Sequence, residues 1–342
     1  MHPDRLERIA LDGVVDADDY YKGEWLTNLQ DTDLIIERFH EDCYSAGPEK
    51  CLLWGNSGPD HSRTIFDRVL NRLEDSPLPV PAFGSFGPEI ITYTDVMTLV
   101  RAALYQPRGW FSVIARLFAA LDQGNGAEIA AIKQMQLSMV CNSPLCTPWR
   151  KDCGNPDLAH LEAGHAILCS DAPDQTNWTA ERHYEKYLTL MDQSKYLGAF
   201  WSEITMECAN WHVRPSWDYV PALEGNTSNP ILWISNSRDP VTPLRNALKM
   251  AKRFTGSAVL TQDADGHCSI SAPSICMAKW IRKYFQNGEL PPEGLMCEPD
   301  SGTFDFGYVS FPPAKVMSKE DWELSEAMEK LSYGFGGGPL GV

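Results

Sequence analysis

Two short apolar runs near the C-terminal end of the chain are separated by an amphipathic segment. The first run, residues 231–234, reads Ile-Leu-Trp-Ile and has the length and composition of a buried strand. Residues 244–254 place apolar side chains on one face and basic side chains on the other, which predicts a helix. Residues 258–260 form the second apolar run. This strand–helix–strand order predicts two neighbouring parallel strands of an α/β sheet.

A polar turn follows each of these predicted strands. Asp239 lies in Ser-Arg-Asp-Pro after the first strand, and His267 lies in Asp-Gly-His after the second. Because parallel strands end at the same edge of a sheet, we expect the two side chains to lie close together. A carboxylate beside an imidazole fixes its tautomer and stabilises the ring when it takes a proton. Asp239 as a helix cap and His267 as an ordinary loop histidine are the alternatives, but the shared strand–turn context favours a catalytic pair.

The rest of the chain is mainly helical in pattern. Residues 9–11 predict one more strand of the same core, within a first segment that we place at 1–19. Between residues 20 and 215 there is little strand signal, and apolar residues recur at helical spacing. Six segments carry this pattern, namely 31–44, 64–73, 95–104, 111–121, 128–140 and 180–200.

The C-terminal third returns to a core-like pattern and then weakens. We place the second part of the core at residues 216–300, where residues 274–287 predict a helix that packs on the sheet. Residues 301–342 are a tail with one predicted helix at 320–331 and a glycine-rich end that predicts disorder.

Four stretches of the chain resemble the TAP-like α/β-hydrolases, the tripeptidyl-aminopeptidase and proline-iminopeptidase-like group of secreted serine peptidases. They are NPILWISNSRDPVTP, DADGHCS and LPPEGLMCEPD towards the C-terminus, and MHPDRLERIALDGVVDADDYY at the start. The resemblance implies a partial α/β-hydrolase fold, with the C-terminal core strands and helices and with residues 20–215 as a large helical cap. It also implies that Asp239 and His267 are the last two members of a triad in the chain order Ser, Asp, His.

The nucleophile of such a triad is absent from the sequence. The family places its serine in a G-x-S-x-G turn, and this chain contains no such motif. By resemblance the motif lies upstream of the segment matched by Met1, so we expect a truncated chain that is inactive alone. Ser57, in Gly-Asn-Ser-Gly-Pro, and Ser85, in Phe-Gly-Ser-Phe-Gly, carry half of the motif and are expected to be loop serines.

The resemblance implies a peptidase that acts on short peptides with a free N-terminus and needs no metal or organic cofactor. Glu203 and Glu207 are spaced i, i+4 on a predicted helix, and they are candidates for holding the α-ammonium of the substrate; ordinary surface glutamates are the alternative. An esterase of the same fold is a second hypothesis, because the acyl-transfer chemistry is shared. A non-catalytic truncated homologue is a third. In a fourth, a separately encoded N-terminal half completes the site for its peptide or small ester substrate.

Charge and hydropathy narrow the classes of partner. The net charge is −17, from 29 basic and 46 acidic residues, and no basic stripe is present. We therefore expect binding neither to nucleic acid nor to an anionic membrane surface. Apolar residues make up 43% of the chain and charged residues 22%, as in a globular protein. Because no run of about 18 apolar residues occurs, we expect no membrane span.

The ten cysteines predict disulfides rather than a zinc ribbon, since no C-x-x-C pair occurs. The favoured pairs are, in order, Cys276 with Cys297, Cys43 with Cys51, and Cys169 with Cys208, and Cys141, Cys146 and Cys153 form a further cluster. Cys268 directly follows His267, so it is badly placed to face the imidazole as a nucleophile. We expect it to be buried or disulfide-bonded.

Two glycosylation sequons add to the evidence for an oxidising, secretory compartment. They begin at Asn177 and Asn226. Disulfides point the same way, and the resembled family is secreted. The N-terminus is charged and lacks the apolar region of a signal peptide. We expect that a signal, like the nucleophile, belongs to a region upstream of this chain.

Overall fold

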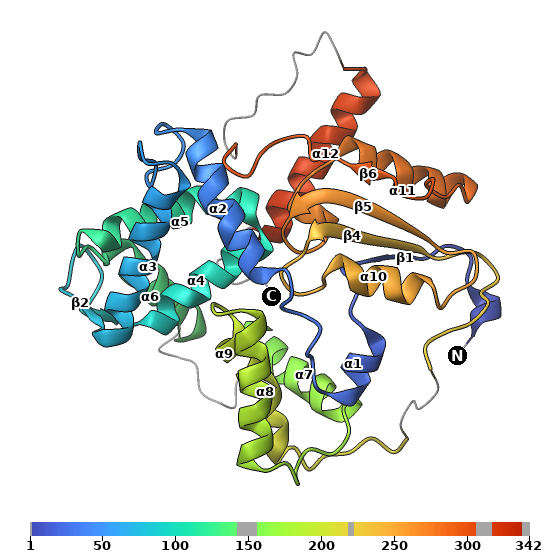
Figure 1. Cartoon of the computed structure of the whole chain (residues 1–342), viewed down its shortest axis with the longest axis horizontal. Helices are drawn as coiled ribbons and strands as arrows, with labels where there is room; N and C mark the ends of the chain where they lie inside the picture. The colour runs from blue at the N-terminus through green and yellow to red at the C-terminus, as the bar shows by residue number, and fades with distance from the viewer. Residues whose placement is uncertain (1, 142–155, 218–221, 306–316, 337–342) are drawn as a thin grey trace.

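A small parallel sheet carries both of the turns that hold Asp239 and His267. The computed structural model describes residues 2–141, 156–217, 222–305 and 317–336. In this part of the chain, a sheet of four parallel strands has the order β1-β4-β5-β6 (Figure 1). The strands are β1 (Ala10–Asp12), β4 (Leu232–Arg238), β5 (Ala258–Asp265) and β6 (Met296–Cys297). The predicted α/β class is confirmed.

The two central strands are longer than their apolar runs. β4 and β5 pair from Leu232 opposite Ala258 as far as Arg238 opposite Asp265, with one irregularity after Asn236. The sequence analysis ended both strands early, because their second halves are polar and read as turns. These polar side chains are nevertheless buried, and Asn236 and Gln262 are both inaccessible to solvent. Buried polar groups require hydrogen-bond partners, so these positions have a structural role that hydropathy alone does not reveal.

Alternating residues of β4 pack on opposite faces of the sheet. Ile231 and Trp233 contact the buried face of α10 (Leu244–Ala251), which lies on one side. Leu232 and Ile234 contact α11 (Ile275–Asn287) on the other side. A strand covered on both faces reads as a continuous apolar run, which is why the sequence identified this one so clearly.

A large helical region is inserted between β1 and β4. Its helices are α1 (Ala17–Lys22), α2 (Thr32–Ala46), α3 (Pro59–Asp75), α4 (Tyr93–Tyr105), α5 (Pro107–Asp122), α6 (Ala127–Cys141), α7 (Pro156–Asp171), α8 (Ala180–Gln193) and α9 (Gly198–Met206). Short 3-10 turns are η1 (Pro3–Arg5), η2 (Glu207–Asn210) and η3 (Ser269–Ser271). The helical pattern predicted for this stretch agrees with these elements.

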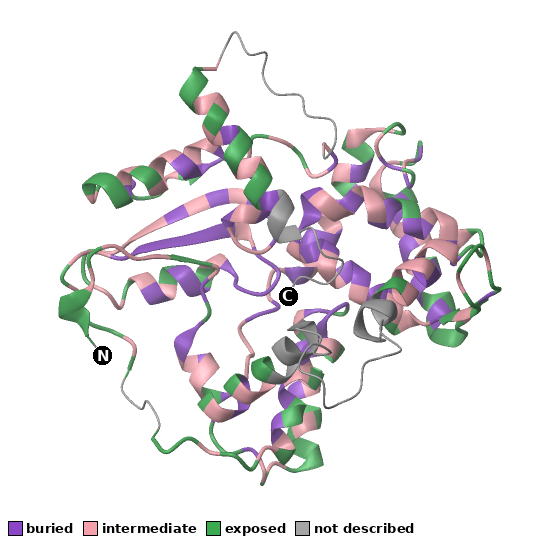
Figure 2. Ribbon diagram, turned by 180° about the vertical axis from the view of Figure 1, so that it is seen from behind, coloured by how far each residue is buried: buried purple, intermediate pink, exposed green. Residues whose placement is uncertain are grey.

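The helical region has its own aromatic core. Phe66 stacks on Phe118 with ring centroids 4.1 Å apart, and Phe39 meets Phe111 edge to face at 5.0 Å. Offset and edge-to-face pairs are the favoured aromatic geometries, and each adds about 1 kcal/mol beyond area burial. Figure 2 shows buried residues concentrated in the sheet and along the inward-facing sides of these helices.

The helical region differs from the sequence prediction in several details, and helices α1 and α7 have no counterpart among the six predicted segments. The single helix expected at 180–200 is two helices, α8 and α9, joined by a turn at Ser194. The helix α8 ends just before Ser194. The Ser194 hydroxyl donates a hydrogen bond to Asp33 and accepts one from the Leu197 N–H at 3.0 Å, which stabilises the turn between the two helices. An antiparallel pair, β2 (Leu78–Val80) with β3 (Glu89–Ile91), forms in a region where the sequence showed little strand signal.

The C-terminal helix α12 (Lys319–Gly336) packs against α11 and against η3, the turn that follows His267 (Figure 1). Lys279 of α11 pairs with Asp321 at 2.7 Å, and Arg108 of α5 pairs with Glu329 at 2.5 Å. The helix predicted at 320–331 is therefore present and is docked. The glycine-rich end predicted to be disordered begins at residue 334; its first three residues belong to α12, which corrects the prediction there, and residues 337–342 lie outside the described residues.

Three disulfides join the cysteine pairs expected from the sequence. Cys43 bonds to Cys51, Cys169 to Cys208, and Cys276 to Cys297. Each bond closes a loop within one part of the fold, and the last ties α11 to β6. Cys268 has a free thiol, so its expected alternative as a disulfide partner is not realised among the described residues. Cys146 and Cys153, and the side chain of Cys141, lie outside the described residues.

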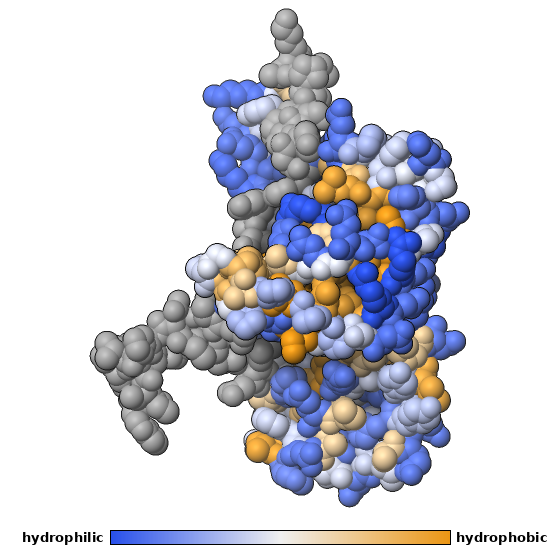
Figure 3. All heavy atoms as spheres, turned by 90° about the vertical axis from the view of Figure 1, so that its left-hand side faces the viewer, coloured by the Kyte–Doolittle hydropathy of each residue, from blue (hydrophilic) through white to orange (hydrophobic). Residues whose placement is uncertain are grey.

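One face of the protein is mostly hydrophilic. Figure 3 faces the side of helices α2 to α6 and shows mostly hydrophilic residues, interrupted by separate hydrophobic spots. Both sequon asparagines, Asn177 and Asn226, are exposed. Among the described residues, we find no helix with the length and apolar character that crossing a bilayer requires.

Replacing Tyr284 by phenylalanine should destabilise the sheet. The Tyr284 hydroxyl accepts the Ile9 N–H at 2.9 Å and donates to the Pro230 carbonyl at 2.7 Å, so it joins α11 to the starts of β1 and β4. Loss of the hydroxyl leaves these partly buried groups without this partner, which should lower the free energy of unfolding by about 1 kcal/mol. Urea denaturation would measure it, with the exposed Tyr44→Phe as the control. Equal stability of the two variants would contradict the role of this hydroxyl.

Candidate active site

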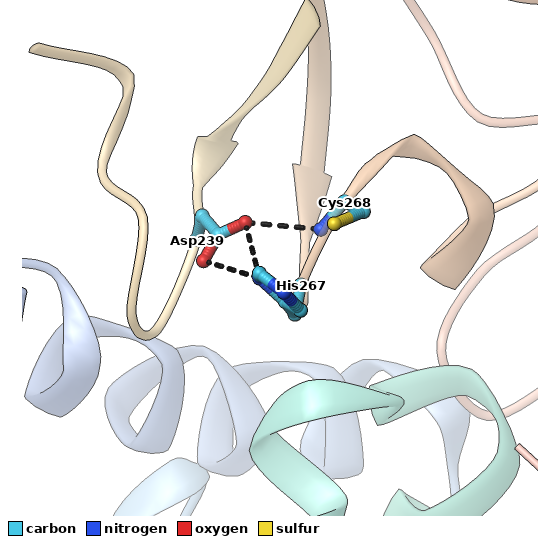
Figure 4. Close-up of side chains that lie close together, drawn as sticks. All are labelled: Asp239, His267 and Cys268. Atoms are coloured by element: carbon cyan, nitrogen blue, oxygen red, sulfur yellow. Dashed lines mark hydrogen bonds and ion pairs between the residues drawn. The ribbon is translucent and has the colours of Figure 1, made fainter. Parts of the chain in front are cut away.

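Asp239 and His267 lie side by side at the C-terminal edge of the sheet. Asp239 directly follows β4, and His267 follows β5 after one glycine. Figure 4 shows the carboxylate and the imidazole pointing toward each other from the ends of neighbouring strands. The parallel register of β4 and β5 produces this proximity, as the order of the sequence segments predicted.

The Asp239 carboxylate is fixed by backbone donors. Its Oδ1 accepts the N–H groups of Val241 at 3.0 Å and Thr242 at 2.7 Å, and its Oδ2 accepts the Cys268 N–H at 3.0 Å. The side chain is 0% exposed. A buried carboxylate needs such donors, because an unpaired charge away from water is costly. The helix cap considered as an alternative is not formed, since α10 begins later, at Leu244.

The His267 ring faces Asp239 through Nδ1. Nδ1 lies 3.2 Å from Oδ1 and 3.1 Å from Oδ2 of Asp239. Carboxylate oxygens only accept hydrogen bonds, so the neutral ring carries its proton on Nδ1 and leaves a lone pair on Nε2. Nε2 has no hydrogen-bond partner among the described residues, and the side chain is 23% exposed. The ring therefore has the orientation of a general base, with the Nε2 lone pair available to accept a proton.

The electrostatic surroundings favour protonation of this imidazole. Burial alone would lower the pKa of His267, but the hydrogen bond to Asp239 and the charges of Asp239 and Asp12 outweigh that effect. The net result is a pKa above the ordinary value for histidine. An imidazolium that forms during catalysis would be stabilised by the same interactions.

Strand β1 contributes two residues to the site that the sequence analysis did not identify. Asp12 accepts the Ser269 N–H at 3.0 Å and the Ser269 hydroxyl at 2.6 Å. It is open to solvent on one side, yet the surrounding protein desolvates it enough to raise its pKa, an effect that the bonds from Ser269 oppose. Gly13 has φ +71°, and a Cβ there would lie 2.5 Å from the Cys268 sulfur and 3.1 Å from the His267 ring. Only glycine fits this approach.

The helical region touches both halves of the pair. Its Asn28 donates to the Val241 carbonyl at 2.9 Å, and its Thr32 donates to the Pro240 carbonyl at 2.7 Å. Both hydrogen bonds fix the turn that follows Asp239. At the end of α4, the Tyr105 carbonyl accepts the His267 N–H at 2.9 Å. The Tyr105 ring meets the imidazole edge to face at 5.1 Å. These contacts join segments that are far apart in the sequence.

The same edge of the sheet holds a set of atoms that could ligate a metal. A carboxylate oxygen of Asp239, a ring nitrogen of His267 and the sulfur of Cys268 lie within 4.8 Å of one another. Zinc accepts this donor set. However, both Asp239 oxygens already accept backbone N–H groups, and burial together with the charges of Asp12 and Asp239 raises the pKa of the Cys268 thiol. These facts favour an acid–imidazole pair and disfavour a thiolate ligand or nucleophile.

The other sequence candidates lie away from the pair. Glu203, on α9, and Glu207, at the start of η2, are both exposed, and neither contacts Asp239 or His267. Glu207 pairs with His165 at 3.0 Å. Ser57 and Ser85 are exposed loop residues, as expected. None of the described serines bonds to the His267 ring.

A cavity of about 370 Å³ lies behind the end of β5, next to the histidine loop. Its lining includes Arg38, Arg238, Asp265 and Ser271. Arg238 bonds to Asp263 at 2.7 Å and to Asp265, so the charged groups of this cavity neutralise one another. The cavity therefore carries no unbalanced charge that would define a ligand.

Replacing Asp239 by asparagine should lower the pKa of His267 toward the ordinary value of about 6.5. The substitution removes the negative charge and one of the two acceptor oxygens that favour the imidazolium. Titration of the ring by NMR would measure the change. Thr242→Val is the matched control, because it removes a 3.2 Å contact to Nδ1 without removing a charge. A pKa that is unchanged in Asp239→Asn would refute the proposed coupling.

The raised pKa of His267 determines how its contribution to the stability of the folded chain changes with pH. A pKa that is raised on folding stabilises the folded chain fully below the unfolded value of about 6.5, and this contribution is lost as the pH rises through the folded value. In denaturant unfolding, the advantage of the wild type over Asp239→Asn should therefore include a part that grows as the pH falls through that window.

Comparison with known proteins gives this geometry a family context. A family model described as "TAP-like protein" matches residues 194–297. Serine protease Hip1 of Mycobacterium tuberculosis is 24% identical over 303 residues, which cover 86% of this chain and 54% of that protein. Carboxylesterase B of the same organism is 23% identical over 216 residues, or 62% of this chain and 38% of the relative. Tripeptidyl aminopeptidase of Streptomyces lividans is 26% identical over 161 residues, or 43% and 29%.

These alignments span between about a third and a half of the relatives' own lengths. The matched region includes β4, β5 and the turns that carry Asp239 and His267. Residues 194–297 thus resemble the C-terminal part of the TAP-like proteins, and the strands and turns that carry Asp239 and His267 lie within this match.

Proposed function

We propose that this chain supplies the carboxylate and the histidine of a serine-hydrolase triad, Asp239 and His267, while the nucleophilic serine comes from polypeptide outside these residues. The observation that carries the proposal is the contact between buried Asp239 and the Nδ1 side of His267, with Nε2 free of partners among the described residues. The relatives are named as a serine protease, an aminopeptidase and a carboxylesterase, which supports the same class. The absence of a G-x-S-x-G motif from the chain is why we assign the nucleophile elsewhere.

In the completed site, His267 would act twice. Nε2 takes the proton from the serine hydroxyl as its oxygen attacks the substrate carbonyl, and Asp239 stabilises the resulting imidazolium. His267 then gives that proton to the leaving amine or alcohol as the tetrahedral intermediate collapses to an acyl-enzyme. A water molecule, deprotonated by the same nitrogen, releases the acid product and regenerates the serine. The raised pKa of His267 suits it to hold the proton between these steps.

The substrate class that we favour is a short peptide with a free N-terminus, as for the relative named tripeptidyl aminopeptidase. In this proposal the helical region, residues 20–215, is a cap over the reacting groups. Its contacts with Pro240, Val241 and His267 support this role, because they bring the helices to the catalytic edge of the sheet. Glu203 and Glu207 are the acidic groups we propose for the α-ammonium.

An esterase of the same fold is the second candidate. One relative is named a carboxylesterase, and the Asp–His arrangement serves ester and amide substrates alike. The three disulfides and the exposed sequons support origin in a secretory compartment for either activity.

A chimera can test the assignment. This chain would replace the matching C-terminal part of the Streptomyces lividans tripeptidyl aminopeptidase, which then supplies the serine. We expect the chimera to cleave a tripeptide anilide and to react with a fluorophosphonate, whereas this chain alone should not be labelled. His267→Gln in the chimera should reduce kcat by at least about a thousandfold, because the general base is lost.

The exposed histidine at position 212 provides the control, and His212→Gln should leave the rate unchanged. A folded chimera whose activity survives His267→Gln would refute the role of this imidazole. Labelling of the unmodified chain by the fluorophosphonate would reveal a nucleophile within it.

The choice between peptide and ester can be measured on the same chimera. An aminopeptidase should lose at least about tenfold in kcat/KM when the substrate N-terminus is acetylated, since a charge-assisted contact worth about 1.4 kcal/mol disappears. Glu203→Gln and Glu207→Gln should then raise KM for the free peptide only. Equal rates with acetylated peptides and simple esters would favour the esterase.

A further inference from the structure

A buried amide on β4 holds the loop that presents His267. Asn236 is 0% exposed, and its side-chain nitrogen donates to the carbonyl oxygens of Gly266 and Cys268, each at 2.8 Å. It also lies 3.0 Å from the Ser271 hydroxyl. Gly266 and Cys268 are the residues immediately before and after His267. We propose that Asn236 is a positioning residue for the catalytic imidazole, an inference that rests on the proposed function.

The backbone on both sides of His267 adopts a conformation that needs such support. Gly266 has φ +111° and Cys268 has φ +62°. The second value is uncommon for a residue with a side chain, and it costs about 1–2 kcal/mol relative to ordinary backbone. The two carbonyls that Asn236 binds belong to these same two residues. Its amide therefore stabilises the particular geometry that turns the imidazole toward Asp239.

The orientation of the amide is determined by its neighbours. The Asn236 nitrogen faces two carbonyl oxygens, which can only accept hydrogen bonds, so a flipped amide would place oxygen against oxygen. Its Oδ1 has no hydrogen-bond partner among the described residues and is buried. Such an unpaired acceptor is costly, which indicates that this position favours an amide for its N–H groups.

Other anchors complete the support of the loop. The Ser271 hydroxyl donates to the Cys268 carbonyl at 2.9 Å, and Asp12 holds Ser269 from β1. Asn236 binds a backbone carbonyl on each side of His267. It lies on β4 three residues before Asp239, which directly follows this strand, so β4 positions both the carboxylate and the loop that brings the imidazole to it.

The neighbouring strand provides a matched control. Gln262 on β5 is equally buried, and its side-chain amide donates to the Ala272 carbonyl. Like Oδ1 of Asn236, its Oε1 is buried without a hydrogen-bond partner among the described residues. Its contact lies beyond the loop residues that flank His267. A substitution there removes a comparable buried hydrogen bond without releasing Gly266 or Cys268.

The test compares Asn236→Leu with Gln262→Met in the full chain. Both variants should lower the thermal midpoint, because each loses a buried bond. Only Asn236→Leu should lower the pKa of His267, by roughly half a pH unit or more, since a loosened loop weakens the contact with Asp239. NMR titration of the imidazole gives this value without any substrate. If Asn236→Leu does not fold, Asn236→Ser, which keeps one donor on a shorter side chain, takes its place.

Equal pKa values in the wild type and in a folded Asn236 variant would overturn the proposal and leave Asn236 as an ordinary structural residue. The titration is independent of hydrolysis, so it separates this inference from the proposed function. In an active chimera, Asn236→Leu should also reduce kcat with little change in KM. A wild-type chimera without activity would count against the proposed function, whereas the titration would still decide the positioning role.

Discussion

The parallel pairing of β4 with β5 is the constraint on which the site depends. Leu232 pairs with Ala258, and the pairing continues to Arg238 beside Asp265, so both strands end at the same level. Asp239 directly follows β4, and His267 follows β5 after Gly266, so the two side chains lie at neighbouring strand ends. Helices on both faces of the sheet hold this register, because a slip would move the buried side chains Trp233 and Ile234 away from their contacts.

Electrostatics at this edge follows from the same register. The Asp239 carboxylate receives three N–H groups from the turns after β4 and β5 and one from the imidazole, so its charge is stabilised by hydrogen bonds. The charges of Asp239, after β4, and of Asp12, at the end of β1, both raise the pKa of the imidazole. The ring keeps one edge open while the other edge is fully engaged, an asymmetry that a general base requires.

The sequence revealed the parts of the site that local pattern controls. Asp239 and His267 stand after apolar runs in recognisable turns, and the cysteine spacing indicated the three disulfides. Asn236 and Asp12 were missed because their meaning depends on partners about 30 and 257 residues away. The one available signal was a polar residue inside a buried strand, and hydropathy reads that signal as the end of the strand. The contact of Tyr105 with His267 leaves no trace in the local sequence at all.

The helix α12 packs next to the histidine loop although it lies outside the region that the family model matches. The family match stops at residue 297, yet α12 lies against η3, the turn directly after His267, and is tied to α11 and α5 by ion pairs. Its Ser325 is buried in that contact region of the chain. A fragment designed to the limits of the match would uncover the rear of the histidine loop. The set of elements packed around the Asp239–His267 edge therefore extends past residue 297, the end of the family match.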